Sequence, residues 1–176
     1  MATSTALVTV EAFRQMTDPP GIRLELHNGE VVHVTRPAHK HFKIQKRLTR
    51  IFNEAFGTLG DASYELAFRA RPEYELRVAD VAWTAAARYE TINEEDSLAG
   101  APEIVVEVLS PSNTVSEMMV KRDLCLSSGC EQFWIVDPKG RFIEITPAQG
   151  PTRVYRGNDL VTVGNANYSV NEILGG

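Results

Sequence analysis

The sequence predicts an α/β (α+β) protein with a mixed central β-sheet flanked by helices. An Asn-Gly dipeptide joins two apolar strands near the amino end, which is typical of an antiparallel hairpin. Apolar residues recur at helical spacing over about 38–59, which indicates a long amphipathic helix. A strand, a helix and a second strand follow one another over 103–136, and this order indicates one parallel crossover.

Composition favours one globular domain, 1–176. A chain of 176 residues suits a single hydrophobic core, and no linker rich in Pro, Gly or Ser divides it. Hydrophobic residues at 43% and charged residues at 23% exclude a fibrous or wholly disordered chain. Two cysteines, Cys125 and Cys130, have no second pair to complete a zinc site, so we expect reduced thiols.

Charge and terminal sequence bear on location and partners. The formal net charge of −5 argues against non-specific adhesion to nucleic acid or membranes, so a polyanion would have to meet a local patch. Neither a signal peptide nor a run of 18 apolar residues is visible. We therefore expect a cytoplasmic protein without a membrane partner.

In the amino-terminal third, turn and cap residues delimit the elements. Thr9 can cap a short helix that ends near Met16, and strands over 22–27 and 30–34 flank the turn at Asn28-Gly29. The apolar stripe of the helix over 38–59 consists of Ile44, Leu48, Ile51, Phe52, Ala55, Phe56 and Leu59.

The remaining chain alternates short apolar runs with turn signals. A second helix over about 114–128 ends at Gly129, a residue that suits a left-handed C-terminal position. A helical turn is expected near 170–174. Strands are expected over 62–69, 78–84, 103–109, 132–136 and 141–145, with one or two more near 152–163.

Acidic residues in the middle of apolar strands are the first candidates for chemistry. Glu107 and Asp80 each stand among apolar residues, where an unpaired carboxylate is costly. They can face one another if their strands pair, and would then need a cation, a donor or a metal. A salt bridge or an exposed strand edge is the alternative. Glu25 is a third candidate, although an acid on the solvated face of a hairpin is ordinary.

A lysine interrupts the apolar stripe of the second helix. Lys121 lies between Met118 and Cys125 at spacings of three and four residues. Its stem can cover the core while the ammonium reaches water. Alternatively, the helix folds back after strand 103–109 and delivers the ammonium to the carboxylates.

The first long helix carries basic residues opposite its apolar stripe, and no acid occurs from 31 to 53. A face of one charge sign suits phosphate groups, or it simply aids solubility. His41 stands where the apolar face begins, so it either looks into the cleft or is a core histidine. The candidate nucleic-acid-binding residues are Lys40, Lys43, Arg47, Arg50 and His41, with Arg36 and Lys46 beside them.

Several motifs follow one another in order along the chain. They are Leu24-Glu-Leu-His-Asn-Gly-Glu30, His41, Ala79-Asp-Val-Ala82, Pro102-Glu-Ile-Val-Val-Glu-Val-Leu-Ser-Pro-Ser112, Lys121 and Glu131-Gln-Phe-Trp-Ile-Val-Asp-Pro138. Together they resemble the Uma-type restriction-endonuclease-like family of the PD-(D/E)XK phosphodiesterase superfamily, over about 22–138. The resemblance implies a mixed sheet flanked by helices and a Mg²⁺-dependent nuclease-like site, in which Mn²⁺ can substitute.

Carried over residue by residue, the resemblance assigns the family's metal-binding acids to Asp80, Glu107 and Glu25, and a catalytic role to these three and Lys121. Two departures stand out. The superfamily has a lysine two residues after the glutamate, where this chain has Leu109, so Lys121 would replace it from the following helix. Ala79 precedes the aspartate where the family usually has proline.

These residues predict a Mg²⁺-dependent DNA endonuclease. Phosphodiester hydrolysis needs neutralised phosphate oxygens, an activated water and a stabilised leaving oxygen. Two alternatives stay open: a catalytically inactive nucleic-acid-binding or assembly protein of the same fold, and a metal-dependent hydrolase of small phosphoesters. DNA is the expected partner, and a homodimer is compatible with the sequence.

Overall fold

The computed structural model describes residues 6–35, 39–92 and 96–175. The strands are β1 (Ile22–His27), β2 (Glu30–Thr35), β3 (Gly60–Arg71), β4 (Glu75–Ala85), β5 (Leu98–Ala99), β6 (Ile104–Val108), β7 (Gln132–Asp137), β8 (Phe142–Pro147), β9 (Arg153–Arg156), β10 (Leu160–Val163) and β11 (Ala166–Ser169). The helices are α1 (Val10–Phe13), α2 (His39–Phe56), α3 (Ala86–Tyr89), α4 (Val115–Ser127) and α5 (Val170–Leu174), with a 3-10 turn η1 (Gly57–Leu59).

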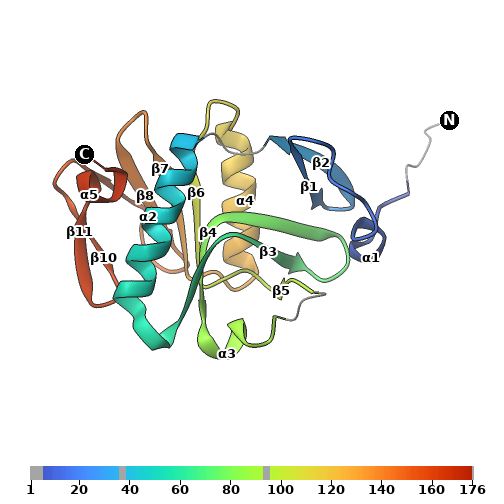
Figure 1. Ribbon diagram of the computed structural model, residues 1–176, viewed down its shortest axis with the longest axis horizontal. Helices are drawn as coiled ribbons and strands as arrows, with labels where there is room; N and C mark the ends of the chain where they lie inside the picture. Colours follow the sequence, from blue (N-terminus) through green and yellow to red (C-terminus); the bar gives the residue numbers. More distant parts are fainter. Residues whose placement is uncertain (1–5, 36–38, 93–95, 176) are drawn as a thin grey trace.

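A mixed nine-stranded sheet forms the centre of the molecule, as the sequence predicts. Its main path is β2-β1-β4-β6-β7-β8-β9, while β3 pairs with β4 and β5 pairs with β3. Helix α2 covers one face of the sheet and α4 covers the other (Figure 1). Among the described residues, no helix combines the length and the hydropathy that crossing a bilayer requires.

The amino-terminal hairpin forms at the predicted turn. Asn28 and Gly29 have φ angles of 49° and 81°, the positive values that a type I′ turn needs at both central positions. The hairpin joins the rest of the sheet where Leu26 of β1 pairs with Leu76 of β4. It carries its own small core, formed by Val10, Phe13, Leu24 and Leu26.

Helix α2 buries the predicted apolar stripe against the sheet. Leu48 and Phe52 are fully buried, and the Phe52 ring meets Trp134 of β7 edge to face at a centroid distance of 5.4 Å. Leu59 does not belong to this stripe, since it is 69% exposed. The helix gives way to the tighter turn η1 before Leu59, so the side chain rotates out of register with the stripe.

The predicted parallel crossover is present. Strands β6 and β7 pair in parallel, from Ile104 with Gln132 to Val108 with Val136, and α4 connects them. Side chains of β6 alternate as expected, because Val106 packs on the α2 side and Val105 on the α4 side. The two cysteines are buried free thiols, also as expected.

Three elements were not predicted. Strand β5 and helix α3 lie in a stretch without clear periodicity, and each is at most four residues long. Strand β11 contains no apolar run, and it pairs with β10 to form a separate hairpin. Short elements of this kind depend on their neighbours in space more than on local propensity.

The amino end of α4 is capped by Thr114. Its hydroxyl accepts a hydrogen bond from the Glu117 amide at 3.2 Å, and the Glu117 carboxylate accepts one from the Thr114 amide at 2.8 Å. We expect Thr114→Ala to lower the free energy of unfolding by about 1 kcal/mol, measured by urea denaturation. Ser116→Ala, an exposed change in the same turn, should cost less. Equal costs would contradict a capping role.

Candidate active site

Asp80 and Glu107 lie at the place where the pairing of β4 with β6 ends. The last pair is Val81 with Val106, and the same register continued by one residue brings Asp80 opposite Glu107. Strict alternation stops here, since Ala79 and Ala82 pack in the same cluster on the α4 side. The irregularity lets the Asp80 side chain reach α2.

Three groups surround the Asp80 carboxylate. The amide Nε2 of Gln45 on α2 donates to Oδ1 at 3.1 Å, and the backbone N–H of Val108 donates to Oδ2 at 2.8 Å. The Nε2 atom of His41 lies 3.0 Å from Oδ2. Asp80 is therefore buried, but both of its carboxylate oxygens have polar neighbours. These contacts offset the cost of burying a carboxylate in an apolar strand.

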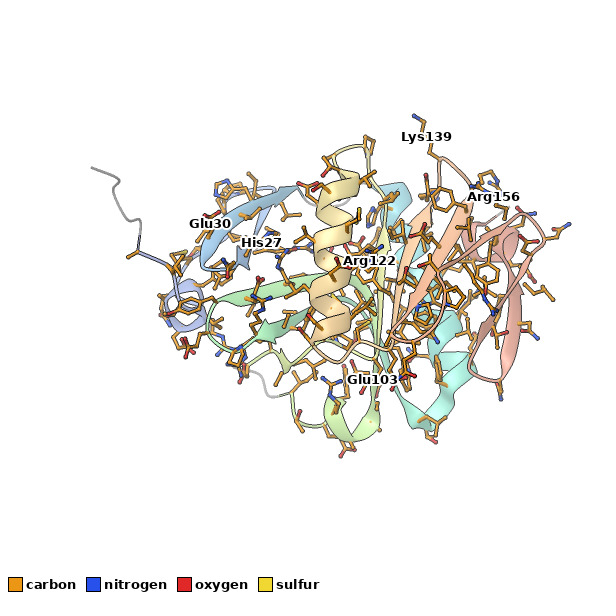
Figure 2. The ribbon with its side chains drawn as sticks, turned by 180° about the vertical axis from the view of Figure 1, so that it is seen from behind. His27, Glu30, Glu103, Arg122, Lys139 and Arg156 are labelled. Carbon is orange, nitrogen blue, oxygen red and sulfur yellow. The ribbon has the colours of Figure 1, made fainter. Side chains whose placement is uncertain are left out.

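Lys121 reaches from α4 to Glu107. Its Nζ lies 2.8 Å from Glu107 Oε1 and donates to the carbonyl oxygen of Val78 at 2.8 Å. The lysine is only 7% exposed, so its ammonium does not extend into water. The helix instead folds back over the sheet and brings the cation to the acid, which is the second of the two arrangements considered for Lys121. Figure 2 shows α4 lying across this face of the sheet.

Glu25 is buried as well, at 3% exposure, and does not lie on a solvated face. Its Oε1 is 3.1 Å from Arg23, and its Oε2 is 3.1 Å from His27 Nε2. Burial by itself would raise the pKa of Glu25. The positive charge of Lys121, the hydrogen bond with His27 and the charge of Arg23 outweigh it and lower the pKa to about 2.

The electrostatics link Glu25, Asp80, Glu107 and Lys121 into one cluster. Burial is the main cause that raises the pKa of Glu107 to about 7; the Lys121 charge opposes it, and the charges of Asp80 and Glu25 add to it. Burial would lower the pKa of Lys121, but Glu107, Glu25 and Asp80 together raise it above its ordinary value. The three carboxylates still outnumber the two cations that pair with them, Lys121 and Arg23, so the site favours a further cation.

The donor atoms suit a hard divalent cation. Among the described residues, no three His, Cys, Asp or Glu side chains are already arranged to hold a metal ion. However, Gln45 Oε1 and His41 Nδ1 are buried without a hydrogen-bond partner. Buried polar atoms normally have partners. Carboxylate and amide oxygens are ligands for Mg²⁺ or Mn²⁺, so the residues fit such an ion.

The acid that directly precedes strand β6 has a different environment. Glu103 stands just before Ile104, at the end of β6 away from Glu107 (Figure 2), and pairs with Arg88 at 2.9 Å. It also accepts a hydrogen bond from the Ala85 amide at 3.2 Å. Glu103 therefore joins α3 to the sheet and takes no part in the charge cluster.

The candidate nucleic-acid-binding residues separate into different environments. Lys43 and Arg50 are exposed, and Arg50 lies 3.7 Å from Glu54. Arg47 donates to the carbonyl oxygen of Ile173 at 3.2 Å, so it connects α2 to α5. His41 faces Asp80, and the side chain of Lys40 lies outside the described part of the chain.

Gln45, Arg23 and His27 touch the site acids but were not singled out in the sequence. A signal for Gln45 was present, because it precedes Leu48 by three residues and Phe52 by seven, on the apolar stripe. No comparable signal marks Arg23 and His27. Charged residues that alternate with Ile22, Leu24 and Leu26 look like the solvated face of a hairpin.

The mixed sheet, with its helices on both faces, defines a restriction-endonuclease-like fold. The Uma2 family, described as "Putative restriction endonuclease", matches residues 10–167, so the chain belongs to this family, as the resemblance implied. A crystal structure described as "a putative nuclease belonging to DUF820" from Anabaena variabilis has a TM-score of 0.81 at 21% sequence identity, and the match covers 96% of this chain and 98% of that one. No curated protein matches.

Proposed function

We propose that this protein is a nuclease that hydrolyses phosphodiester bonds of DNA, as a Mg²⁺-dependent endonuclease. The observation that carries the proposal is the approach of Lys121 from α4 to Glu107 on β6, within the charge field of Asp80 and Glu25. An ion pair with a purely structural role would need only one acidic partner for Lys121. Membership of the Uma2 family, described as "Putative restriction endonuclease", supports the same activity.

In this proposal Asp80 and Glu107 hold the ion, and Glu25 adds negative charge beside them. When bound, Mg²⁺ neutralises phosphate oxygens and makes its bound water more acidic. The Lys121 ammonium then orients the attacking water or stabilises the negative charge that develops on the phosphate. Gln45 and the Val108 N–H keep the Asp80 carboxylate in place. Burial of all four charged side chains limits bulk water, which strengthens these interactions.

The proposal predicts that supercoiled plasmid is cut in Mg²⁺ by the parent protein and not by Asp80→Asn. Isothermal titration with Mn²⁺ should show binding in the parent and none in that variant, because the change removes a ligand charge. Glu131→Gln, a change of an exposed acid, is the matched control and should behave as the parent. Equal cutting or equal Mn²⁺ binding by Asp80→Asn would refute the assignment.

A second test separates DNA from a small phosphoester. Lys43 and Arg50 are exposed on α2, so we expect Lys43→Gln with Arg50→Gln to weaken DNA binding and flatten its salt dependence. Removing one cation that binds a DNA phosphate should reduce the slope of log affinity against log salt by about 0.9. The measurement uses fluorescence anisotropy without divalent ions, so that the DNA stays intact.

The control for this test is Lys139→Gln with Arg141→Gln. Lys139 lies on the turn after β7 (Figure 2), and both double variants change the net charge from −5 to −7. An equal decrease in affinity from both pairs would indicate a general field effect and not direct binding of phosphates by α2. Absence of DNA binding by the parent at low salt would favour a small-phosphoester hydrolase or a protein without catalysis.

A further inference from the structure

Gln45 is a fully buried amide in which Nε2 has a hydrogen-bond partner and Oε1 has none. It is 0% exposed, and its Nε2 donates to Asp80 Oδ1 at 3.1 Å. Its Oε1 is buried without any partner. An acceptor left unsatisfied in this way is destabilising. A leucine would pack on the same apolar stripe without that cost, so packing does not explain the amide.

The hydrogen bond from Gln45 to Asp80 does not fully explain why position 45 carries an amide either. The Val108 N–H already holds Oδ2 at 2.8 Å, and the donor Nε2 accounts for only one end of the Gln45 side chain. The unpaired Oε1 is not isolated, because Nδ1 of His41, one helical turn earlier on α2, is also buried without a partner. Two unpaired buried atoms, on two side chains that contact the same carboxylate, favour a polar, hydrated ligand.

We infer that Gln45 is a positioning residue of the metal site: Nε2 fixes the Asp80 carboxylate, and Oε1 accepts a hydrogen bond from a water of a hydrated divalent cation. Asp80 Oδ1 accepts one hydrogen bond, from Gln45, and so keeps a lone pair for the ion. Mg²⁺ retains several of its waters in proteins, and a neutral amide oxygen is a suitable acceptor for one of them. This inference rests on the proposed function, since it assumes the metal that Asp80 and Glu107 would hold.

The test measures Mn²⁺ affinity of the metal-free full chain by isothermal titration. Removal of a group that orients a ligand typically lowers metal affinity by about 10- to 100-fold, and we expect that decrease in Gln45→Leu. Its melting temperature without metal reports whether the variant folds, since leucine also removes the hydrogen bond to Asp80 Oδ1. Gln132→Leu is the matched control: Gln132 is a partly buried glutamine on β7, outside the site, and its replacement should leave Mn²⁺ affinity unchanged.

Gln45→Glu provides an independent readout if Gln45→Leu does not fold. The new carboxylate keeps an acceptor oxygen but repels Asp80 in the metal-free protein, so saturating Mn²⁺ should raise its melting temperature more than that of the parent. Equal shifts in melting temperature for the parent and Gln45→Glu would overturn the inference. So would a Mn²⁺ affinity of Gln45→Leu within about twofold of that of the parent, provided that the parent binds Mn²⁺. A parent that binds no Mn²⁺ would instead refute the metal site, and with it the proposed function.

Discussion

Replacing Lys121 with methionine is expected to lower the rate constant of DNA cleavage at saturating Mg²⁺ by about 10²- to 10³-fold. That is the usual effect of deleting one group that stabilises developing charge in a transition state. Methionine keeps most of the stem and deletes the ammonium that lies 2.8 Å from Glu107 Oε1. Single-turnover kinetics separate this chemical step from binding. Mn²⁺ affinity should be maintained or increased, because a competing cation leaves the carboxylates.

Lys139→Met is the matched control for this prediction. Lys139 is exposed on the turn after β7, so its replacement should leave the cleavage rate unchanged. In the Lys121 variant Glu107 loses its cationic neighbour, so the metal-free protein should be less stable near pH 8 and recover when Mn²⁺ is added. Cleavage by Lys121→Met at the parent rate would end the catalytic assignment.

Glu107→Gln is expected to abolish Mn²⁺ binding and cleavage, and to stabilise the metal-free protein near pH 8. Burial raises the pKa of Glu107 from 4.5 to about 7, so the folded protein holds this proton more tightly than the unfolded chain. Its contribution to stability is complete below pH 4.5 and is lost as pH rises through about 7. The loss amounts to at most about 1.4 kcal/mol per pH unit, and glutamine avoids it because it cannot ionise.

Urea denaturation curves, recorded from about pH 5 to pH 8 in the presence of a metal chelator, check the prediction. Stability of the parent should decline more steeply over this interval than stability of Glu107→Gln. Glu25→Gln is the informative comparison. In the parent, the pKa of Glu25 is lowered to about 2, so ionised Glu25 stabilises the fold above pH 4.5 and this stability is lost as pH falls. Glu25→Gln should therefore destabilise the protein near pH 7. Parallel pH profiles for the parent and Glu107→Gln would contradict the prediction.

Elements that local chemistry specifies were predictable. Asn28-Gly29 favours positive φ at both turn positions whatever surrounds the hairpin, so the turn could be read directly. The stripe through Leu48 and Phe52 has a helical period, and the crossover of β6, α4 and β7 follows from apolar runs at the right lengths. Leu59 was assigned to the stripe wrongly, since periodicity does not show where a helix tightens into a 3-10 turn.

Candidate site residues were predictable where a polar group interrupts an apolar pattern. Asp80, Glu107 and Lys121 each do so, and the cost of burying an unpaired charge made each of them conspicuous. Gln45 interrupts the stripe of α2 in the same way but was overlooked, because a neutral amide incurs a smaller cost than a charge.

By itself, the sequence determined which segments form the central elements and which acids and lysine are out of place in them, because periodicity, turn chemistry and desolvation act locally. Only the tertiary structure decided which of these groups meet. The loss of alternation at Asp80, the reach of Lys121 to Glu107 and the pairing of Arg47 with the end of α5 depend on the relative placement of distant elements. Such contacts leave no periodic trace along the chain, since each joins residues that are far apart in sequence.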